Sequence, residues 1–388
     1  MPAPVSGARN PVRVLAYADS AVFSGAEAVH CDLVRGLGAS GALELRCLAP
    51  RANADLVECL RQATGEAPGD VPAQRLSLAA LDLYSPRRRA ALGRALAARP
   101  CDVMLVNLPS AEYGATPMLA RRPSGTKGVG FLHVPGSPRE LGFRLGVVRE
   151  RLARKPMSRF DAICVVTDSA RRAFERLWAG PDVAVHVVRL PAPRVSPVPR
   201  EQARAELGLP AGVVIGMAGR ISFKQKGQDT FVHAAARLLA ERPELRFAIA
   251  GEGRDLPALR QLIGNLGLAG RVFLLGQVSP IERFLSAIDA IAIPSRFEGL
   301  PLVALEALSL GVPGVAADID GLSDVWPRPW RVGPGDDRAL AAGLSAVLGA
   351  SVEERSRLIG QGRERVAANT SSDSASALES VILEVANG

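Results

Sequence analysis

The chain has 388 residues, of which 48% are apolar and 22% charged, with a formal net charge of +8. This length predicts two domains, each large enough to bury its own core, and the charged fraction is ordinary for a globular protein. No uncharged apolar run reaches the roughly 18 residues of a membrane-spanning helix, and residues 1–11 lack the apolar region of a secretory signal. We therefore expect neither an integral membrane protein nor a secreted one.

Short apolar runs alternate with segments of helical periodicity along the chain. The first series of predicted strands is Val12–Ala18, Leu45–Leu48, Val103–Asn107, Val129–His133, Ile163–Thr167 and Val185–Val188. The second series is Val213–Ala218, Phe247–Ala250, Val272–Leu275, Ala290–Ile293 and Val312–Ala316. The predicted helices include Glu27–Leu37, Arg88–Ala98, Thr230–Leu239 and Leu302–Leu310. This alternation predicts an α/β fold of doubly wound parallel sheets covered on both faces.

The proline-rich segment Leu190–Arg200 separates the two series and predicts an extended linker, because its prolines prevent regular structure. We therefore predict a first domain over residues 1–193 and a second over residues 194–374. A last helix is predicted at Ala377–Val385. Ligands of such sheets bind beyond the carboxyl ends of the strands, so two facing domains would form a cleft for two substrates.

The cysteines and histidines show no spacing typical of a disulfide framework or a zinc site. The five cysteines are Cys31, Cys47, Cys59, Cys101 and Cys164. The four histidines are His30, His133, His186 and His233. An odd number of scattered cysteines predicts free thiols in a reducing compartment, so we expect a cytoplasmic protein without a bound metal.

Two segments of the first half are candidate binding loops. Asp19–Glu27 follows the first predicted strand, and its small residues Ser24 and Gly25 would admit a phosphate or a sugar. A simple tight turn is the alternative interpretation. His133 ends another predicted strand, at the edge where ligands of such sheets bind, although an isolated histidine is more often structural.

The positive charge is concentrated in the first half. Residues 1–193 contain 26 Lys and Arg against 17 Asp and Glu; subtraction from the totals of 47 and 39 leaves 21 against 22 for residues 194–388. The densest basic segment contains Arg139, Arg144, Arg149, Arg151, Arg154, Lys155 and Arg159, with only Glu140 and Glu150 as acids. Such a pattern can mark a surface that meets phosphates, acidic saccharides or anionic lipid. Peripheral membrane contact of this segment is one hypothesis, and a merely solvated basic face is the more common case.

Cations follow the first strand of the second series. Gly219 allows close approach of the backbone to a ligand, and Arg220, Lys224 and Lys226 follow it. Fixed cations at a strand's carboxyl end can stabilise a leaving diphosphate without a divalent metal. An exposed basic loop is the alternative.

Two carboxylates follow a later strand. Glu298 and Glu306 are separated by seven residues, and Pro301 between them is placed at the first turn of a helix. Glu306 then lies inside an apolar helix, where an unpaired charge is costly, and a sugar diol that donates two hydrogen bonds would satisfy it. The amides of Gly299 and Leu300 predict an anion site at the helix start. The alternative is that both glutamates are structural.

Together these motifs resemble the family 4 (group 1) retaining glycosyltransferases of the GT-B fold, over nearly the whole chain. The residues that carry the resemblance are Gly219-Arg220, Lys226-Gly227, Ala250-Gly251-Glu252-Gly253, Leu275-Gly276-Gln277-Val278, the pair Glu298 and Glu306, and the run from Ala307 to Pro313. The resemblance implies two facing Rossmann-like domains, with the donor held by the second and the last helix packed back on the first.

The resemblance also implies an activity and the roles of individual residues. A hexose would pass from a UDP- or GDP-sugar to a saccharide, lipid-linked or natural-product acceptor, with retention and without a metal, and no nucleic acid is an expected partner. Arg220 and Lys226 would hold the diphosphate, Glu306 the ribose, and Glu298 and His133 the transferred sugar. The remaining donor-binding residues would be Gly25, Gly219, Glu252, Gly276, Val278, Gly299 and Leu300.

Departures from the family pattern concentrate in the acceptor half. Ser24-Gly25 replaces a Gly-Gly pair, and Val134 stands where Asp is common; a later Gly-Gly-x-x-Glu run appears as Asp320–Asp324. A nucleotide-sugar epimerase and a catalytically degenerate interaction protein are the alternative functions. A nicotinamide-dependent oxidoreductase fits poorly, because Arg220 follows Gly219 where the helix of a dinucleotide-binding motif should begin.

Overall fold

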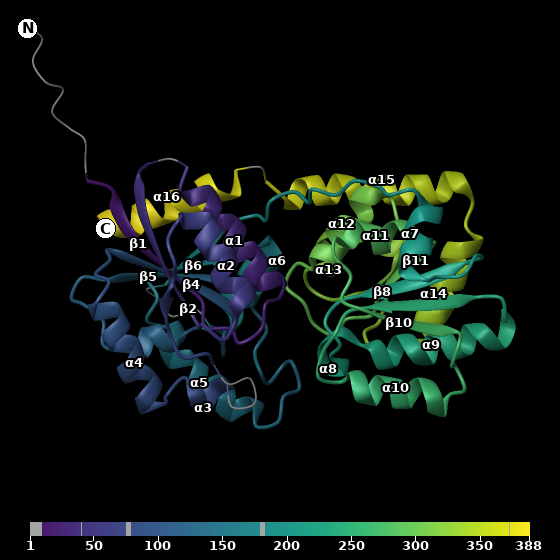
Figure 1. Cartoon of the computed structure of the whole chain (residues 1–388), viewed down its shortest axis with the longest axis horizontal. Coiled ribbons are helices and arrows are strands. Elements are labelled where there is room, and N and C mark those ends of the chain that lie inside the picture. Colours follow the sequence, from purple (N-terminus) through teal and green to yellow (C-terminus); the bar gives the residue numbers. More distant parts are fainter. Residues whose placement is uncertain (1–9, 40, 75–78, 179–182, 372) are drawn as a thin grey trace, which may run out of the picture. The chain divides into compact units, whose positions relative to one another are not determined.

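The computed structural model describes residues 10–39, 41–74, 79–178, 183–371 and 373–388 (Figure 1). Most of the segment in which a secretory signal would lie is outside these residues. The chain divides into two compact units: unit 1 comprises residues 1–190 and 373–388, and unit 2 comprises residues 191–372. The sequence placed the boundary at residue 193 and assigned the last helix to the first domain.

Unit 1 is built on a sheet of seven strands in the order β3-β2-β1-β4-β5-β6-β7, and every pair is parallel. The strands are β1 (Val12–Tyr17), β2 (Leu43–Ala49), β3 (Gly69–Asp70), β4 (Val103–Ser110), β5 (Lys127–Val134), β6 (Ala162–Val165) and β7 (Ala184–Val187). The register pairs Val14 of β1 with Leu45 of β2 and Val103 of β4. The inner strands are almost wholly buried, which explains why they appear as continuous apolar runs.

Helices cover both faces of this sheet. They are α1 (Gly25–Leu37), α2 (Ala54–Thr64), α3 (Ala79–Asp82), α4 (Pro86–Ala97), η2 (Thr116–Leu119), α5 (Gly146–Met157), α6 (Asp168–Leu177) and α16 (Ser374–Asn387). The terminal helix α16 packs against α1 within unit 1 (Figure 1). Helix α1 begins with Ser24 and Glu27 at the spacing of a capping box and buries Val29, Leu33 and Leu37.

Unit 2 is built on a parallel sheet of six strands in the order β10-β9-β8-β11-β12-β13. The strands are β8 (Val214–Ala218), β9 (Arg246–Ala250), β10 (Val272–Gly276), β11 (Ala290–Ile293), β12 (Gly314–Ala317) and β13 (Arg331–Val332). The helices are α7 (Arg200–Leu207), α8 (Phe223–Lys226), α9 (Gln228–Glu241), α10 (Leu256–Asn265), α11 (Ile281–Ala287), α12 (Leu302–Leu310), α13 (Leu322–Val325), η3 (Arg328–Trp330), α14 (Asp337–Gly349) and α15 (Val352–Asn369).

The strand order reverses once in each sheet, between β1 and β4 in unit 1 and between β8 and β11 in unit 2. Loops on either side of such a reversal diverge at the carboxyl ends of the strands, and ligands of doubly wound sheets bind there. The candidate ligand-binding loops are therefore those after β1 and β4 in unit 1 and those after β8 and β11 in unit 2.

The secondary-structure predictions are confirmed for all eleven strands and the five helices named above, within a few residues at each end. The two-residue strands β3 and β13 were not predicted, because two residues carry no periodicity. One detail was wrong: Pro301 is the residue before α12, and the helix begins at Leu302. Throughout the described ranges, no helix combines the length and apolar character required to cross a membrane.

Candidate functional site

Glycines with positive φ angles lie at the carboxyl ends of three neighbouring strands in unit 2. Gly219 follows β8, Gly251 follows β9, and Gly276 is the last residue of β10. The amide of Gly251 donates to the carbonyl of Gly276 at 2.6 Å, and a Cβ on Gly251 would lie 2.1 Å from the carbonyl oxygen of Gly219. A side chain at position 251 would therefore clash with the main chain of Gly219, which explains the glycine there.

The loop after β8 carries the predicted cations and is fixed by a buried glutamine. Gln228 accepts a hydrogen bond from the amide of Ser222 and donates one to the carbonyl of Arg220. Arg220 itself is exposed, and its guanidinium donates to Oε1 of Gln225 at 2.8 Å. The buried Gln228 side chain therefore fixes the backbone of this loop, while the Arg220 side chain faces solvent.

Arg296 ties this loop to the end of β11, and the sequence analysis missed it. Its guanidinium pairs with Asp229 at 2.7 Å, donates to Oγ1 of Thr230, and contacts the carbonyl of Phe223. Its own amide donates to the carbonyl of Gln225 at 2.7 Å. The only sequence signal was its place directly after a predicted strand, in the same loop as Glu298.

Lys226 and Glu298 contact each other across the reversal between β8 and β11. Nζ of Lys226 lies 2.5 Å from Oε1 of Glu298, and their side chains are 17% and 7% exposed. Oγ of Ser295 donates to the same carboxylate oxygen at 2.9 Å. From the sequence, the two residues were expected to contact different parts of a donor; in the structure they form an ion pair with each other.

Glu306 has no such partner. It lies in α12 between the buried residues Leu305 and Ala307, and no described residue forms a hydrogen bond or an ion pair with its carboxylate. Burial, followed by the negative charge of Glu282, raises its pKa to about 7. A carboxylate held in this state gains stability from any ligand that donates hydrogen bonds to it.

Two residues shortly before α12 have amides without a described acceptor, and a glycine distant in the sequence packs against them. Gly299 and Leu300 are buried, and neither amide has an acceptor among the described residues. Gly321, which has a φ of +82°, packs so closely on Gly299 that a Cβ at position 321 would overlap the Gly299 carbonyl oxygen. This packing orients the peptide ahead of the helix, where free amides favour an anion.

The two other predicted donor-binding residues of unit 2 lie at the same edge of the sheet. Glu252 is exposed, and its backbone carbonyl accepts a hydrogen bond from the amide of Ile221 at 2.7 Å. Val278 is half-buried in the loop that follows β10. All predicted site residues of unit 2 therefore follow the carboxyl ends of β8, β9, β10 or β11.

In unit 1 the predicted His133 belongs to a chain of polar side chains. Its Nε2 lies 2.9 Å from Oδ1 of Asn107, whose Nδ2 donates to Oε1 of Glu27 at 3.5 Å. Ser24 donates to the other oxygen of Glu27 at 2.6 Å. The sequence analysis missed Asn107 and Glu27 as members of this group, although it placed both at the ends of predicted elements. The predicted Gly25 is the exposed first residue of α1.

His133 and the nearby His30 are both neutral at physiological pH. Burial, with a smaller effect of His30, lowers the pKa of His133 to about 3. His30 is buried one turn after Glu27, neither of its ring nitrogens has a hydrogen-bond partner among the described residues, and its pKa is lowered to about 4. Neither ring therefore supplies positive charge to a ligand.

Asp19, at the start of the predicted binding loop, is engaged in the core of unit 1. Its carboxylate pairs with Arg88 at 2.5 Å and accepts a hydrogen bond from the hydroxyl of Tyr17. Arg88 also pairs with Asp82 at 2.6 Å. Asp19 is thus structural, and only the later part of its loop is available to a ligand.

The basic segment of residues 139–159 separates into engaged and available side chains. Arg149 pairs with Glu112 and lies over the ring of Phe143, and Arg154 pairs with Glu150. Among the described residues, no ion pair engages Arg139, Arg144, Arg151 or Lys155. The apolar side chains at the start of α5 are unusually exposed: Leu145 (75%), Val147 (50%) and Val148 (51%).

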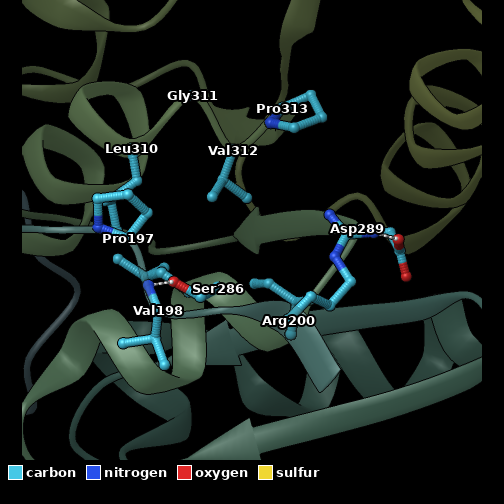
Figure 2. Close-up of a pocket in the computed structure, with 11 residues that line it drawn as sticks. Pro197, Val198, Arg200, Ser286, Asp289, Leu310, Gly311, Val312 and Pro313 are labelled. Carbon is cyan, nitrogen blue, oxygen red and sulfur yellow. Dashed lines mark hydrogen bonds and ion pairs between the residues drawn. The ribbon is translucent and has the colours of Figure 1, made fainter. Parts of the chain in front are cut away.

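A cavity of about 270 Å³ lies elsewhere in unit 2 (Figure 2). Its walls include Val198 of the linker, Asp289 just before β11, and Pro313 just before β12. Arg200 pairs with Asp289 inside it. Because these residues precede their strands, the cavity lies at the amino ends of the strands, opposite the edge that carries the candidate site.

Comparison with known proteins gives a consistent picture. Residues 24–191 match a family model described as glycosyl transferase 4-like domain, and residues 212–350 match one described as glycosyl transferases group 1. The chain is 33% identical over 177 residues to alpha-D-kanosaminyltransferase of Streptomyces kanamyceticus, covering 44% of this chain and 46% of that one. It is 38% identical over 185 residues to D-inositol 3-phosphate glycosyltransferase of Nocardia farcinica, covering 45% and 40%.

These alignments therefore span less than half the length of either relative. The fold matches more completely. The crystal structure of Anabaena HepE in complex with UDP and glucose superposes with a TM-score of 0.75, covering 96% of this chain and 99% of that one at 21% identity.

Proposed function

The chain belongs to the family 4 (group 1) glycosyltransferases of the GT-B fold, and from this premise we propose that it transfers a hexose from a UDP- or GDP-sugar to a saccharide, lipid-linked or natural-product acceptor. We propose further that transfer retains the anomeric configuration and needs no metal. The observation that carries the proposal is the carboxyl edge of the unit 2 sheet, whose loops and following helix carry the cations Arg220 and Lys226 and the Glu306 carboxylate, which has no partner among the described residues.

The cations suit the charge that develops during transfer. When the bond between the anomeric carbon and the phosphate oxygen breaks, the leaving diphosphate gains negative charge. Arg220 is exposed, and Lys226, whose ion-pair partner among the described residues is Glu298, can exchange that carboxylate for phosphate oxygens. The free amides of Gly299 and Leu300 add neutral donors to the same anion site.

Glu306 suits the ribose of the nucleotide. A carboxylate with no protein partner can accept hydrogen bonds from two adjacent hydroxyls, and a nucleoside supplies such a diol. Binding would therefore favour the ionised form of Glu306 and lower its raised pKa. This contact is the same in the bound donor and in the transition state, so it contributes to affinity rather than to turnover.

Glu298 and His133 are assigned to the transferred sugar. Once Lys226 turns to the diphosphate, the Glu298 carboxylate is released toward a sugar ring that gains positive character. His133 is neutral, so it suits hydrogen bonding to a hydroxyl rather than charge stabilisation. HepE was crystallised with UDP and glucose, which makes uridine nucleotides the first donors to examine.

The test has two stages. Thermal shifts with UDP, GDP, ADP and TDP should identify one nucleotide that raises the melting temperature, since ligand binding stabilises the folded state by mass action. The corresponding nucleotide sugars are then incubated with acceptor panels, and release of the nucleoside diphosphate and the anomeric configuration of the product are measured. A transferase releases diphosphate only when an acceptor is present, and an epimerase converts the sugar without one. Stabilisation by no nucleotide would reject the proposal.

We also propose that α5 touches an anionic membrane. Its amino-terminal end exposes three apolar side chains, and the free cations Arg144, Arg151 and Lys155 lie on or beside the same helix. Apolar residues that enter the lipid boundary together with flanking cations are typical of peripheral membrane contact. The proposal agrees with a lipid-linked acceptor.

A further inference from the structure

Glu27, Asn107 and His133 form a directional chain of hydrogen bonds at the strand reversal of unit 1. Glu27 comes from the first turn of α1, Asn107 from β4, and His133 from the neighbouring strand β5. Glu27 and Asn107 are 0% and 1% exposed, so neither can turn to water for a different partner. The orientation of each group is therefore fixed by its neighbours.

The carboxylate of Glu27 sets the direction of the chain. It occupies the third position of α1 in a capping box, where Ser24 donates to one oxygen and the backbone amides of Ser24 and Glu27 also face the carboxylate. Burial raises the pKa of Glu27, and these donors oppose that rise. An ionised carboxylate only accepts hydrogen bonds.

Asn107 links the Glu27 carboxylate to His133 and determines which of its own amide atoms faces the histidine. Nδ2 of Asn107 donates to Oε1 of Glu27 at 3.5 Å, which is the orientation that an ionised Glu27 requires. Its Oδ1 then faces Nε2 of His133 at 2.9 Å. An amide oxygen only accepts as well, so the hydrogen bond requires a proton on Nε2.

We propose that Glu27 and Asn107 are positioning residues that hold neutral His133 in the tautomer with its proton on Nε2, which leaves the Nδ1 lone pair free to accept a hydrogen bond from a sugar hydroxyl. The second part rests on the proposed function, and the first does not. No described residue hydrogen-bonds Nδ1, and the ring of Phe131 packs against the imidazole at a centroid distance of 5.2 Å. His30, whose charge would also lower the pKa of His133, is itself neutral.

The tautomer can be measured directly by long-range ¹H–¹⁵N NMR of the full chain labelled at its histidines. The four histidines make the spectrum simple, and a His133→Gln variant identifies the signals of interest. We expect His133 to show a protonated Nε2 and an unprotonated Nδ1 near neutral pH. A proton on Nδ1, or a mixture of both tautomers, would overturn the inference without any variant being needed.

A Glu27→Gln variant should reverse the donor and acceptor roles in the hydrogen bonds from residue 27 through Asn107 to His133. Ser24 still donates to the side-chain oxygen of residue 27, so the new amide nitrogen of Gln faces Asn107. Asn107 then turns its Oδ1 toward this nitrogen and presents its Nδ2 to the histidine. His133 should switch to a proton on Nδ1. A Glu27→Gln, Asn107→Asp double variant should restore the proton on Nε2, because both carboxylate oxygens at position 107 accept. Glu58→Gln, on the exposed face of α2, is the matched control and should change nothing. An unchanged tautomer in folded Glu27→Gln protein would overturn the role of Glu27.

Kinetics separates this inference from the proposed function. Glu27→Gln should lower kcat/KM for the nucleotide sugar about tenfold, the loss of one hydrogen bond, and the double variant should recover most of it. If no nucleotide sugar is turned over but His133 carries its proton on Nε2, the proposed function fails and the positioning stands. If transfer proceeds and the wild-type proton is on Nδ1, the function stands and the positioning fails.

Discussion

The edges of the two sheets are built alike but hold their polar groups in opposite ways. In unit 1 the polar side chains at the strand reversal satisfy one another, from Ser24 through Glu27 and Asn107 to His133. In unit 2, Glu306 has no partner among the described residues, and Lys226 forms an ion pair with Glu298. The difference teaches that the polar side chains at one edge are satisfied within their own unit, whereas the other edge carries a carboxylate that no described residue satisfies.

The largest expected effect comes from removing the exchangeable cation. Lys226→Met should lower kcat by about 10²- to 10³-fold, because a fixed positive group is lost where negative charge develops. Steady-state kinetics with the preferred donor measures it. Lys224→Met, in the same short helix, is the matched control and should keep most activity. Equal losses in the two variants would mean that the loop matters only for its total charge.

Removing the partner of that cation should act mainly on turnover. Glu298→Gln keeps the acceptor for Ser295 but removes the charge, and we expect kcat to fall about ten- to a hundredfold with little change in the donor KM. Melting curves check that the loss of the ion pair has not unfolded the protein. A raised KM with unchanged kcat would show that Glu298 contributes uniform binding instead.

Replacing Glu306, which has no partner among the described residues, should weaken donor binding but stabilise the folded protein. Glu306→Gln should raise the donor KM about tenfold with kcat nearly unchanged, since ribose binding is the same in ground and transition states. The ligand-free variant should also melt higher than the wild type at pH 8. If Glu306 had a structural partner, the variant would melt lower.

The pH dependence of that difference follows from the raised pKa of Glu306. The folded pKa of about 7 lies above the ordinary value of 4.5, so ionisation destabilises the folded state. The wild type should therefore lose stability relative to Glu306→Gln as pH rises from about 4.5 to about 7, and the difference should stay constant above that. Donor affinity of the wild type should improve over the upper part of this range, and Glu282→Gln should shift the midpoint downward.

The surface of α5 offers a smaller effect. Arg144→Ala or Arg151→Ala should each weaken binding to vesicles containing anionic phosphatidylglycerol about fivefold, on the scale of about 1 kcal/mol per cation. Co-sedimentation measures it, and Arg154→Ala is the control because that side chain is paired with Glu150. Binding that is no stronger to anionic than to neutral vesicles would end the membrane proposal.

The smallest expected effect is that of a chelator. If Arg220 and Lys226 supply the charge that a metal would otherwise provide, turnover should be unchanged in excess chelator. Loss of activity that magnesium or manganese restores would show that the cations of unit 2 are not sufficient.

The sequence by itself determined the strands and the order of the motifs along them. Apolar runs and helical periodicity are local properties, so they located β8 and β11 and placed Arg220, Lys226 and Glu298 directly after them. The apolar neighbours of Glu306 in its own helix are also a local property, and they were enough to indicate that its carboxylate needs a partner.

Only the tertiary structure decided which of these groups meet. The hydrogen bond between Asn107 and Glu27 joins residues 80 positions apart, and that between Arg296 and Asp229 joins residues 67 apart. The same holds for the division of residues 139–159 into paired cations and cations without a described ion pair, since Arg149 pairs with Glu112 in the loop after β4. Such contacts depend on which strands become neighbours in a sheet, and this choice is made by packing over the whole unit rather than by the residues next to each group in the chain.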